Sequence, residues 1–314
     1  MSEFDLIQRY FTRPTPSAEL GVGDDAAILR VSEGKELVIS TDMLVSGTHF
    51  FADAAPFQLG HKTLAVNLSD LAAMGAVPRW ATLAIALPSV DEQLLEKFSA
   101  GFFALADNNG IELIGGDTTR GPLNLCVTIM GEVPRGKALR RDGAQVGDDI
   151  WVSGKLGRAA LGLANLQGRF KFYGEVRDDC LAALHQPQPR IALGLALRGI
   201  AHSAIDISDG LLADLGHILE RSLVGAVVDV ETLPIVDDGV EKDVAQHCAL
   251  SGGDDYELCF TAASRERDVL AALAEQLKLP LTRIGTIRAE QGCDVRDAEG
   301  VVMKIEKGGY DHFA

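Results

Sequence analysis

The feature that most limits the possible folds of this chain is the alternation of short strand-like and longer helix-like segments along its length. The helix-like segments place apolar residues three and four positions apart, as Leu64, Leu68 and Leu71 illustrate. The predicted strands are 37–40, 81–87, 112–114, 125–130, 150–152, 204–207, 226–230 and 257–261, and the predicted helices are 57–74, 91–109, 156–167, 190–198, 211–221 and 265–277. This mixture predicts the α/β class, including mixed α+β arrangements.

A basic, glycine-punctuated segment, PRGKALRRDG at 134–143, interrupts the alternation near the middle of the chain. The chain has 314 residues, and about 150 residues per domain is a reasonable expectation. We therefore predict two domains, at residues 1–140 and 141–314, each long enough to bury a core. The basic segment between them would act either as a hinge or as a phosphate clamp.

The net charge limits the possible binding partners, and the cysteines indicate the cellular compartment. The net charge of −16 argues against nucleic acid and anionic membrane surfaces as partners. Apolar runs such as 80–87 are too short to span a bilayer, and the N-terminus shows no signal-peptide pattern. The five cysteines form no C-x-x-C pair, which is typical of a reducing compartment, so the predicted location is the cytoplasm.

The familiar nucleotide-binding and catalytic motifs are either absent or stand in the wrong sequence context. GVGDDA at 21–26 fits the G-x-G-x-x-A dinucleotide fingerprint, but RPTPS at 13–17 precedes it where a buried strand is needed. Serine, glutamate and glycine at 32–34 then interrupt any following helix. The chain has no P-loop, and its seven histidines form no H-x-x-x-H pair from which a catalytic arrangement could be drawn.

The remaining candidates for a functional site are carboxylates at the ends of apolar runs. Asp42, Asp117, Asp206 and Asp254 each follow such a run or stand next to paired glycines. Taken singly, any one of these aspartates is readily explained as a turn residue or a helix N-cap. Taken together, they match the oxygen ligands that Mg²⁺ prefers, beside glycines that let a backbone approach phosphate. The set therefore predicts metal-assisted phosphoryl transfer.

With these residues assembled, the chain resembles the thiamine-monophosphate kinases, which belong with aminoimidazole ribonucleotide synthetase, selenophosphate synthetase and hydrogenase maturation factor E in one ATP-binding superfamily. The matching motifs run almost end to end: GVGDD (21–25), STD (40–42), AVNLSDLAAMG (65–75), GGDTTRG (115–121), AIDISDG (204–210), SGGDDYEL (251–258) and GYDHF (309–313). The resemblance implies a two-domain fold whose N-terminal sheets pair across a homodimer. ATP, several Mg²⁺ ions and thiamine monophosphate would meet in a cleft between an N-terminal ATP- and metal-binding domain and a C-terminal domain.

The implied reaction is direct in-line transfer of the γ-phosphoryl group of ATP to thiamine monophosphate, which yields thiamine pyrophosphate in the last step of its biosynthesis. Carried over by position, the Mg²⁺ ligands would be Asp25, Ser40, Thr41, Asp42, Asp70, Asp117, Asp206 and Asp209, of which Asp42, Asp70, Asp117 and Asp209 are the predicted catalytic residues. ATP would contact Gly116, Asp117, Arg141 and Ser208, and thiamine monophosphate would contact His49, Asp254 and Tyr310.

One position departs from the family pattern, which often has glutamate where this chain has Asp254. The aspartate is shorter by one methylene. It would reach the substrate directly or through a water molecule, or Asp255 would take part instead.

Other members of the superfamily and other protein classes remain as alternatives. Selenophosphate synthetase would have a cysteine or selenocysteine near the N-terminus, but the first cysteine here is Cys126. The hydrogenase factor would have a C-terminal cysteine, whereas this sequence ends in HFA. Aminoimidazole ribonucleotide synthetase is not excluded by motifs alone. A non-catalytic nucleotide sensor and an acidic structural protein are the alternatives from other classes.

Overall fold

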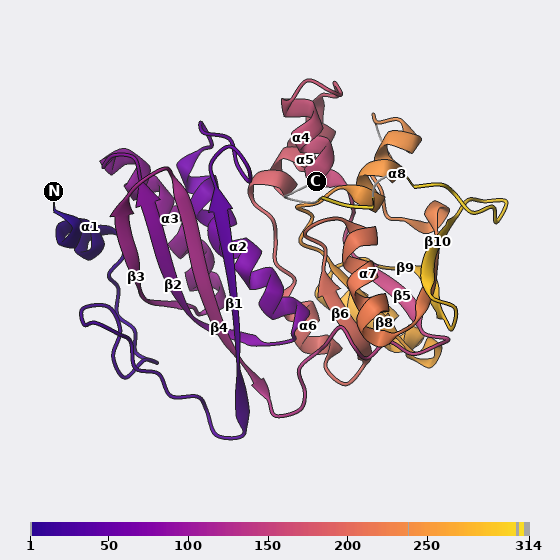
Figure 1. The fold of residues 1–314 in the computed structure, drawn as a ribbon, viewed down its shortest axis with the longest axis horizontal. Helices are drawn as coiled ribbons and strands as arrows, with labels where there is room; N and C mark the ends of the chain where they lie inside the picture. The colour runs from indigo at the N-terminus through magenta and orange to yellow at the C-terminus, as the bar shows by residue number, and fades with distance from the viewer. Residues whose placement is uncertain (1, 238, 306–307, 311–314) are drawn as a thin grey trace. The chain divides into compact units, whose positions relative to one another are not determined.

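The computed structural model describes residues 2–237, 239–305 and 308–310. It divides the chain into two compact units, which are described separately (Figure 1). The first unit comprises Met1–Leu71 and Ala76–Gly136, and the second comprises Ala72–Gly75 and Lys137–Ala314. Each combines a β-sheet with helices, so the predicted mixed α/β class is confirmed.

The first unit contains a four-stranded sheet in the order β1-β4-β2-β3. Its elements are α1 (Glu3–Tyr10), β1 (Lys35–Val45), α2 (Pro56–Ala73), β2 (Val77–Leu87), α3 (Glu92–Asn109), β3 (Glu112–Arg120) and β4 (Asn124–Pro134). Strands β2 and β3 are parallel, whereas β4 runs antiparallel to both β1 and β2. Helices α2 and α3 cover one face of this sheet (Figure 1).

Local sequence explains why these helices form where they do. The Asp91 side chain accepts hydrogen bonds from the backbone N–H groups of Gln93 and Leu94, which caps the start of α3. Gly110, at φ 65°, ends the same helix in the left-handed conformation. In α2, the three leucines at the predicted helical spacing are fully buried, and α3 buries Phe98 and Phe102. The core of the first unit therefore lies where the apolar periodicity predicted it.

The second unit contains a six-stranded sheet in the order β10-β7-β9-β5-β8-β6. Its strands are β5 (Asp149–Ser153), β6 (Ala201–Asp206), β7 (Gly225–Asp229), β8 (Leu258–Ala262), β9 (Leu281–Arg288) and β10 (Gly292–Arg296). Its helices are α4 (Arg158–Leu166), α5 (Gly174–His185), α6 (Ile191–Leu197), α7 (Leu211–Ser222), α8 (Lys242–Ser251) and α9 (Arg267–Leu277), with short 3₁₀ turns at Val230–Thr232 and Ser264–Glu266.

This second sheet is buried on both faces. Helix α7 packs Leu215 and Ile218 into a core that includes Val152 and Cys259 of the sheet. Helices α6 and α9 join a second core, which includes Phe260 of β8. Because Cys259 and Phe260 are adjacent on one strand, their side chains leave opposite faces. No helix in the described part of the chain combines the length and apolar character that a membrane crossing requires.

Candidate functional site

The first cluster of predicted site residues lies where β1 meets α2. The Ser40 hydroxyl donates a hydrogen bond to the Asp70 carboxylate. The backbone N–H of Asp42 donates to the side-chain oxygen of Asn67 at 3.1 Å. Asn67 in turn donates to the carbonyl of Thr63, one turn earlier in α2, so its orientation is fixed. Helix α2 thus brings Asp70 beside the strand that carries Asp42, and both supply oxygen ligands suited to Mg²⁺.

The predicted strands ended at residues 40 and 114, before Asp42 and Asp117, and both of these ends were wrong. Asp42 lies inside β1, and Asp117 lies inside β3, which pairs with β2 as far as Arg120. A row of paired residues runs across the sheet from Asp42 through Val127 and Leu83 to Gly116.

Three interstrand spacings separate the two ends of this row, a span of about 14 Å. Asp42 and Asp117 therefore lie on the two edge strands of this sheet, β1 and β3.

The second cluster lies in the second unit, at the turn from β6 into α7. Asp206 ends β6 and is buried, and Ser208 and Asp209 follow it in the turn. The Ser208 carbonyl accepts a hydrogen bond from the backbone N–H of Asp254 at 2.8 Å, and the Asp209 carbonyl accepts one from that of Tyr310 at 2.9 Å. Residues predicted to bind metal (Asp206, Asp209), ATP (Ser208) and substrate (Asp254, Tyr310) therefore meet at one turn.

A buried carboxylate that sequence reasoning missed organises this turn. One oxygen of Asp214, in the first turn of α7, accepts hydrogen bonds from the backbone N–H groups of Ser208, Asp209 and Gly210 at 3.0, 3.0 and 3.2 Å. Burial raises the pKa of Asp214 to about 7, although these N–H groups oppose the shift. The available signal was the ADLG segment just after the ISDG motif, but nothing in it distinguished Asp214 from a surface residue.

The side chain of Asp255, the proposed alternative to Asp254, makes its hydrogen bonds to the start of another helix. Its carboxylate accepts hydrogen bonds from the backbone N–H groups of Gly157, at 2.6 Å, and Ala159, at 3.4 Å, and so caps the N-terminus of α4. Asp255 is buried, whereas Asp254 is partly exposed and accepts a hydrogen bond from the Tyr256 hydroxyl. Asp255 therefore supports the structure, and Asp254 remains the candidate for substrate contact.

The capping role of Asp255 leads to a pH prediction. Burial raises its pKa to about 8, so between about pH 4 and pH 8 the folded protein retains a proton that the unfolded chain has released. The free energy of unfolding should therefore fall as pH rises through this window, by at most about 1.4 kcal/mol per pH unit. Asp255→Asn cannot titrate, so urea unfolding of parent and variant should show the parent losing stability relative to the variant from pH 5 to 8. A constant difference would mean that the carboxyl group is ionised throughout.

The remaining predicted residues are placed as follows. The His49 ring accepts the backbone N–H of Val45 at its Nδ1, which leaves Nε2 as the nitrogen that carries the proton. Asp25 is exposed. Arg141 is also exposed, with its carbonyl accepting a hydrogen bond from Ser222. The Thr41 hydroxyl pairs with that of Thr128 at 2.9 Å. Tyr310 is half-exposed, and the part of its motif at 311–313 lies outside the described residues.

The predicted metal ligands fall into two sets. Asp25, Ser40, Thr41, Asp42, Asp70 and Asp117 belong to the first unit, and Asp206 and Asp209 to the second. Across 2–237, 239–305 and 308–310, no group of three or more histidine, cysteine, aspartate or glutamate side chains is arranged to hold a metal ion. The donors are hard oxygens in pairs, which fits Mg²⁺, an ion that takes one or two protein carboxylates and completes its shell with water and phosphate.

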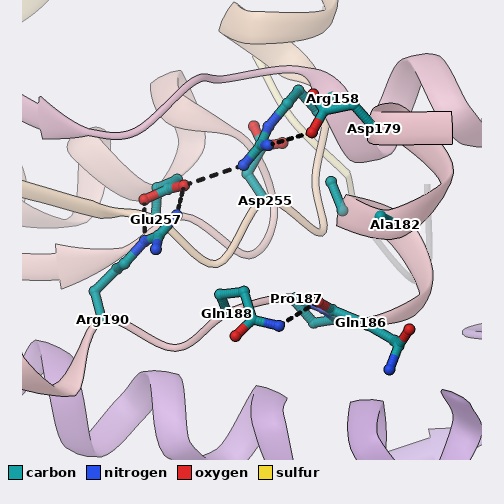
Figure 2. A pocket seen from close by; sticks show the side chains of 10 residues that line it. Arg158, Asp179, Ala182, Gln186, Pro187, Gln188, Arg190, Asp255 and Glu257 are labelled. Carbon is teal, nitrogen blue, oxygen red and sulfur yellow. Dashed lines mark hydrogen bonds and ion pairs between the residues drawn. The ribbon is translucent and has the colours of Figure 1, made fainter. Parts of the chain in front are cut away.

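A polar cavity of about 250 Å³ opens within the second unit (Figure 2). Arg158, Arg190 and Glu257 line it together with Asp179, Asp255 and a segment of α5 and the residues after it, from Ala182 to Gln188. Arg190 and Arg158 both turn toward the Glu257 carboxylate, and Arg158 also reaches Asp179 (Figure 2). Neither arginine, nor Glu257, was predicted to be functional from the sequence.

The sequence and the fold place the chain in a known class. Residues 23–133 match the N-terminal domain of the AIR synthase related proteins, and residues 145–298 match their C-terminal domain. The thiamine-monophosphate kinase of Escherichia coli strain K12 is 50% identical over 321 residues, which cover 99% of this chain and 98% of that protein.

Two solved structures agree with this classification. The crystal structure of thiamine-monophosphate kinase from Stenotrophomonas maltophilia K279a matches with a TM-score of 0.87 and 52% identity, over 96% of this chain and 98% of the other. AaThiL complexed with AMPPCP and TMP matches with a TM-score of 0.78 and 30% identity, over 90% and 89%. The chain therefore has the two-domain fold of the AIR synthase related proteins. Within that class, it belongs to the thiamine-monophosphate kinase family.

Proposed function

We propose that this protein transfers the γ-phosphoryl group of ATP to thiamine monophosphate and so forms thiamine pyrophosphate, the last step of thiamine pyrophosphate biosynthesis. The observation that carries the proposal is the full-length relationship to thiamine-monophosphate kinases at 50% identity. The related AaThiL was solved with AMPPCP, an ATP analogue, and with TMP, which supports the same pair of substrates here. Because ATP is the donor, we place the reaction in the cytoplasm.

The proposed chemistry depends on positioning and charge neutralisation. The acceptor phosphate has a second pKa near 6, so it is largely ionised at neutral pH and needs no general base. Asp42, Asp70, Asp117 and Asp209 would hold the metal, with Asp25, Ser40, Thr41 and Asp206 as further ligands. Mg²⁺, when bound, would neutralise charge on the phosphates. Gly116, Asp117, Arg141 and Ser208 would position ATP, and His49, Asp254 and Tyr310 would position the acceptor.

The proposal is tested by incubating the purified protein with Mg-ATP and one acceptor at a time. The acceptors are thiamine monophosphate, thiamine, the aminoimidazole ribonucleotide precursor and selenide, and both ADP and thiamine pyrophosphate are measured. We expect ADP and thiamine pyrophosphate in equal amounts with thiamine monophosphate only, and no product after chelation of Mg²⁺. Binding of Mg-ATP without any transfer would instead favour a nucleotide sensor.

We also propose that the protein is a homodimer that pairs through the face of the first sheet opposite α2. The Ser40 side chain contacts Asp70 of α2, so the residues of β1 at odd-numbered positions face away from that helix. Three of these, Leu37, Ile39 and Met43, are large apolar residues with exposed fractions of 39, 58 and 52%. Such a row of exposed apolar side chains on one strand is typical of a protein–protein interface.

Replacing Ile39 with glutamate should convert the dimer to a monomer, because a charge placed in an apolar interface would be buried without a partner. Light scattering after size-exclusion chromatography measures the change in mass. Val301→Glu serves as the control, since Val301 is equally exposed (60%) but lies in the second unit. A parent protein that already runs as a monomer, or equal effects of both substitutions, would contradict the proposed interface.

A further inference from the structure

Glu257 is a buried carboxylate with an unusually complete set of hydrogen-bond donors. It is only 1% exposed and directly precedes β8. Arg190 contacts it through two nitrogens, Nε at 2.6 Å and Nη2 at 2.5 Å, and Arg158 approaches at 3.5 Å. The Ser153 hydroxyl donates to it at 2.6 Å and accepts the backbone N–H of Leu258. A planar, two-bond contact of this kind fixes both partners in one geometry.

The segment just before Glu257 has a strained backbone. Asp254 and Tyr256 have φ values of 69° and 49°, in the left-handed region that side-chain-bearing residues seldom adopt. The other described residues of this kind, Leu223 and Lys278, are ordinary C-caps of helices α7 and α9. Neither Asp254 nor Tyr256 ends a helix. Strain of this kind persists only where surrounding contacts hold it, and it concentrates at ligand-binding positions.

Contacts on both sides hold this strained segment in place. The backbone N–H groups of Asp254 and Tyr256 donate to the carbonyls of Ser208 and Ile207, at 2.8 Å each. Asp255 is tied to the start of α4, and Glu257 is tied to Arg190 just before α6. The Glu257 carbonyl also accepts the backbone N–H of Ile207 at 2.8 Å, so loss of the side-chain contact with Arg190 would loosen this end of the segment without releasing it. The position of the Asp254 side chain would then be less tightly defined.

We propose that Glu257 and Arg190 are a positioning pair for the acceptor substrate. The pair holds residues 252–256 in the strained conformation that presents Asp254 to thiamine monophosphate. This inference rests on the proposed function, because Asp254 faces the acceptor only there. It assigns a role to two residues outside the predicted ATP-binding and metal-binding sets, and it separates them from Asp255, which caps a helix.

A matched control exists at the far end of the same strand pair. Asp149 of β5 pairs with Ala262 at the end of β8 and is also 1% exposed. It accepts a two-bond contact from Arg267, at 2.6 and 2.7 Å, and a longer contact from a second arginine, Arg283, at 3.4 Å. Asp149→Asn therefore removes the same kind of charge from the same sheet without touching the strained segment.

The first test compares steady-state kinetics of Glu257→Gln and Asp149→Asn. In either variant an amide N–H₂ group faces guanidinium donors, so both should lose similar stability. Only Glu257→Gln should raise the KM for thiamine monophosphate, by about tenfold, with kcat and the KM for ATP within about twofold of the parent. Arg190→Lys keeps the charge but not the two-bond contact, so a smaller rise in the same KM is expected. Arg190→Lys also provides the test of the pair if Glu257→Gln does not fold.

The second test is independent of activity. Hydrogen–deuterium exchange measured by mass spectrometry should show faster exchange of the peptide spanning residues 252–257 in Glu257→Gln, but not in Asp149→Asn. An unchanged KM for the acceptor with unchanged exchange, or equal changes in both variants, would overturn the inference. A parent without thiamine-monophosphate kinase activity would overturn the proposed function instead. The exchange result would then decide whether the pair holds the segment.

Discussion

Replacing Asp42 with asparagine is expected to lower kcat by about 100-fold or more, with little change in stability. The substitution keeps the size of the side chain and one oxygen but removes the negative charge that would hold Mg²⁺. Asp42 has intermediate exposure and is anchored through its backbone N–H to Asn67, a contact that the variant retains. The free energy of unfolding should therefore stay within about 1 kcal/mol of the parent.

The experiment measures kcat as a function of Mg²⁺ concentration and, in parallel, thermal unfolding. Glu36→Gln is the control, because Glu36 is an exposed carboxylate on the same strand whose side chain, among the described residues, hydrogen-bonds only to the backbone N–H of Gly136. It should leave kcat unchanged. A variant of Asp42 that melts well below the parent would show that the residue is structural. Unchanged kcat with an intact fold would remove Asp42 from the predicted metal ligands.

Residue periodicity and local signals were sufficient for elements that carry their own amphipathic pattern. The helix predicted at 57–74 is α2 at Pro56–Ala73, and the one at 91–109 is α3 with Asp91 as its cap. Among the described residues, five α-helices and β-strands were missed: α1, α5, α8, β9 and β10. Strand β9 reads LTRIGTIR, with two arginines and a glycine, and it forms because β5 and β7 pair with it on either side. Such tertiary pairing overrides local preference and leaves no periodic signal.

The ordered motifs supplied the residues predicted for the candidate site, but not the roles of the residues that support them. Asp214 and Glu257 are acidic, and acidic residues are usually exposed, so nothing in the sequence marks them as buried. Their partners explain the burial: three consecutive backbone N–H groups for Asp214, and an arginine 67 positions away for Glu257. Contacts this distant in sequence become visible only in the fold.

The GGDTTR segment at 115–120 is a further case in which the sequence did not predict the fold, because the strand continues through it. The predicted strand ended at residue 114, just before this segment. In the structure it continues β3 in register with β2, from Gly115 beside Thr82 to Arg120 beside Leu87. The two glycines of this segment nevertheless differ in their structural roles. A Cβ atom would overlap the neighbouring strand at Gly116 but not at Gly115.

Replacing Gly116 with alanine should destabilise the protein by about 3–5 kcal/mol, or prevent β2 and β3 from pairing altogether. Gly116 has φ 151°, and a Cβ atom there would lie 1.8 Å from the carbonyl oxygen of Leu83 and 2.6 Å from its carbonyl carbon. Both are main-chain atoms of the neighbouring strand, so no side-chain rotation relieves the overlap. The strands would have to separate, and Asp117 would move with β3.

Gly115→Ala is the matched control, one residue away on the same strand. A Cβ at Gly115 meets only the Thr82 methyl group, at 4.0 Å, which is ordinary contact. Its stability in urea unfolding should therefore equal that of the parent or exceed it slightly, because alanine restricts the unfolded chain. If the KM for ATP nevertheless rises in Gly115→Ala, the backbone at this position approaches the nucleotide. If Gly116→Ala is as stable as the parent, the close approach to Leu83 is not what requires glycine, and a ligand-binding role becomes the better explanation for both residues.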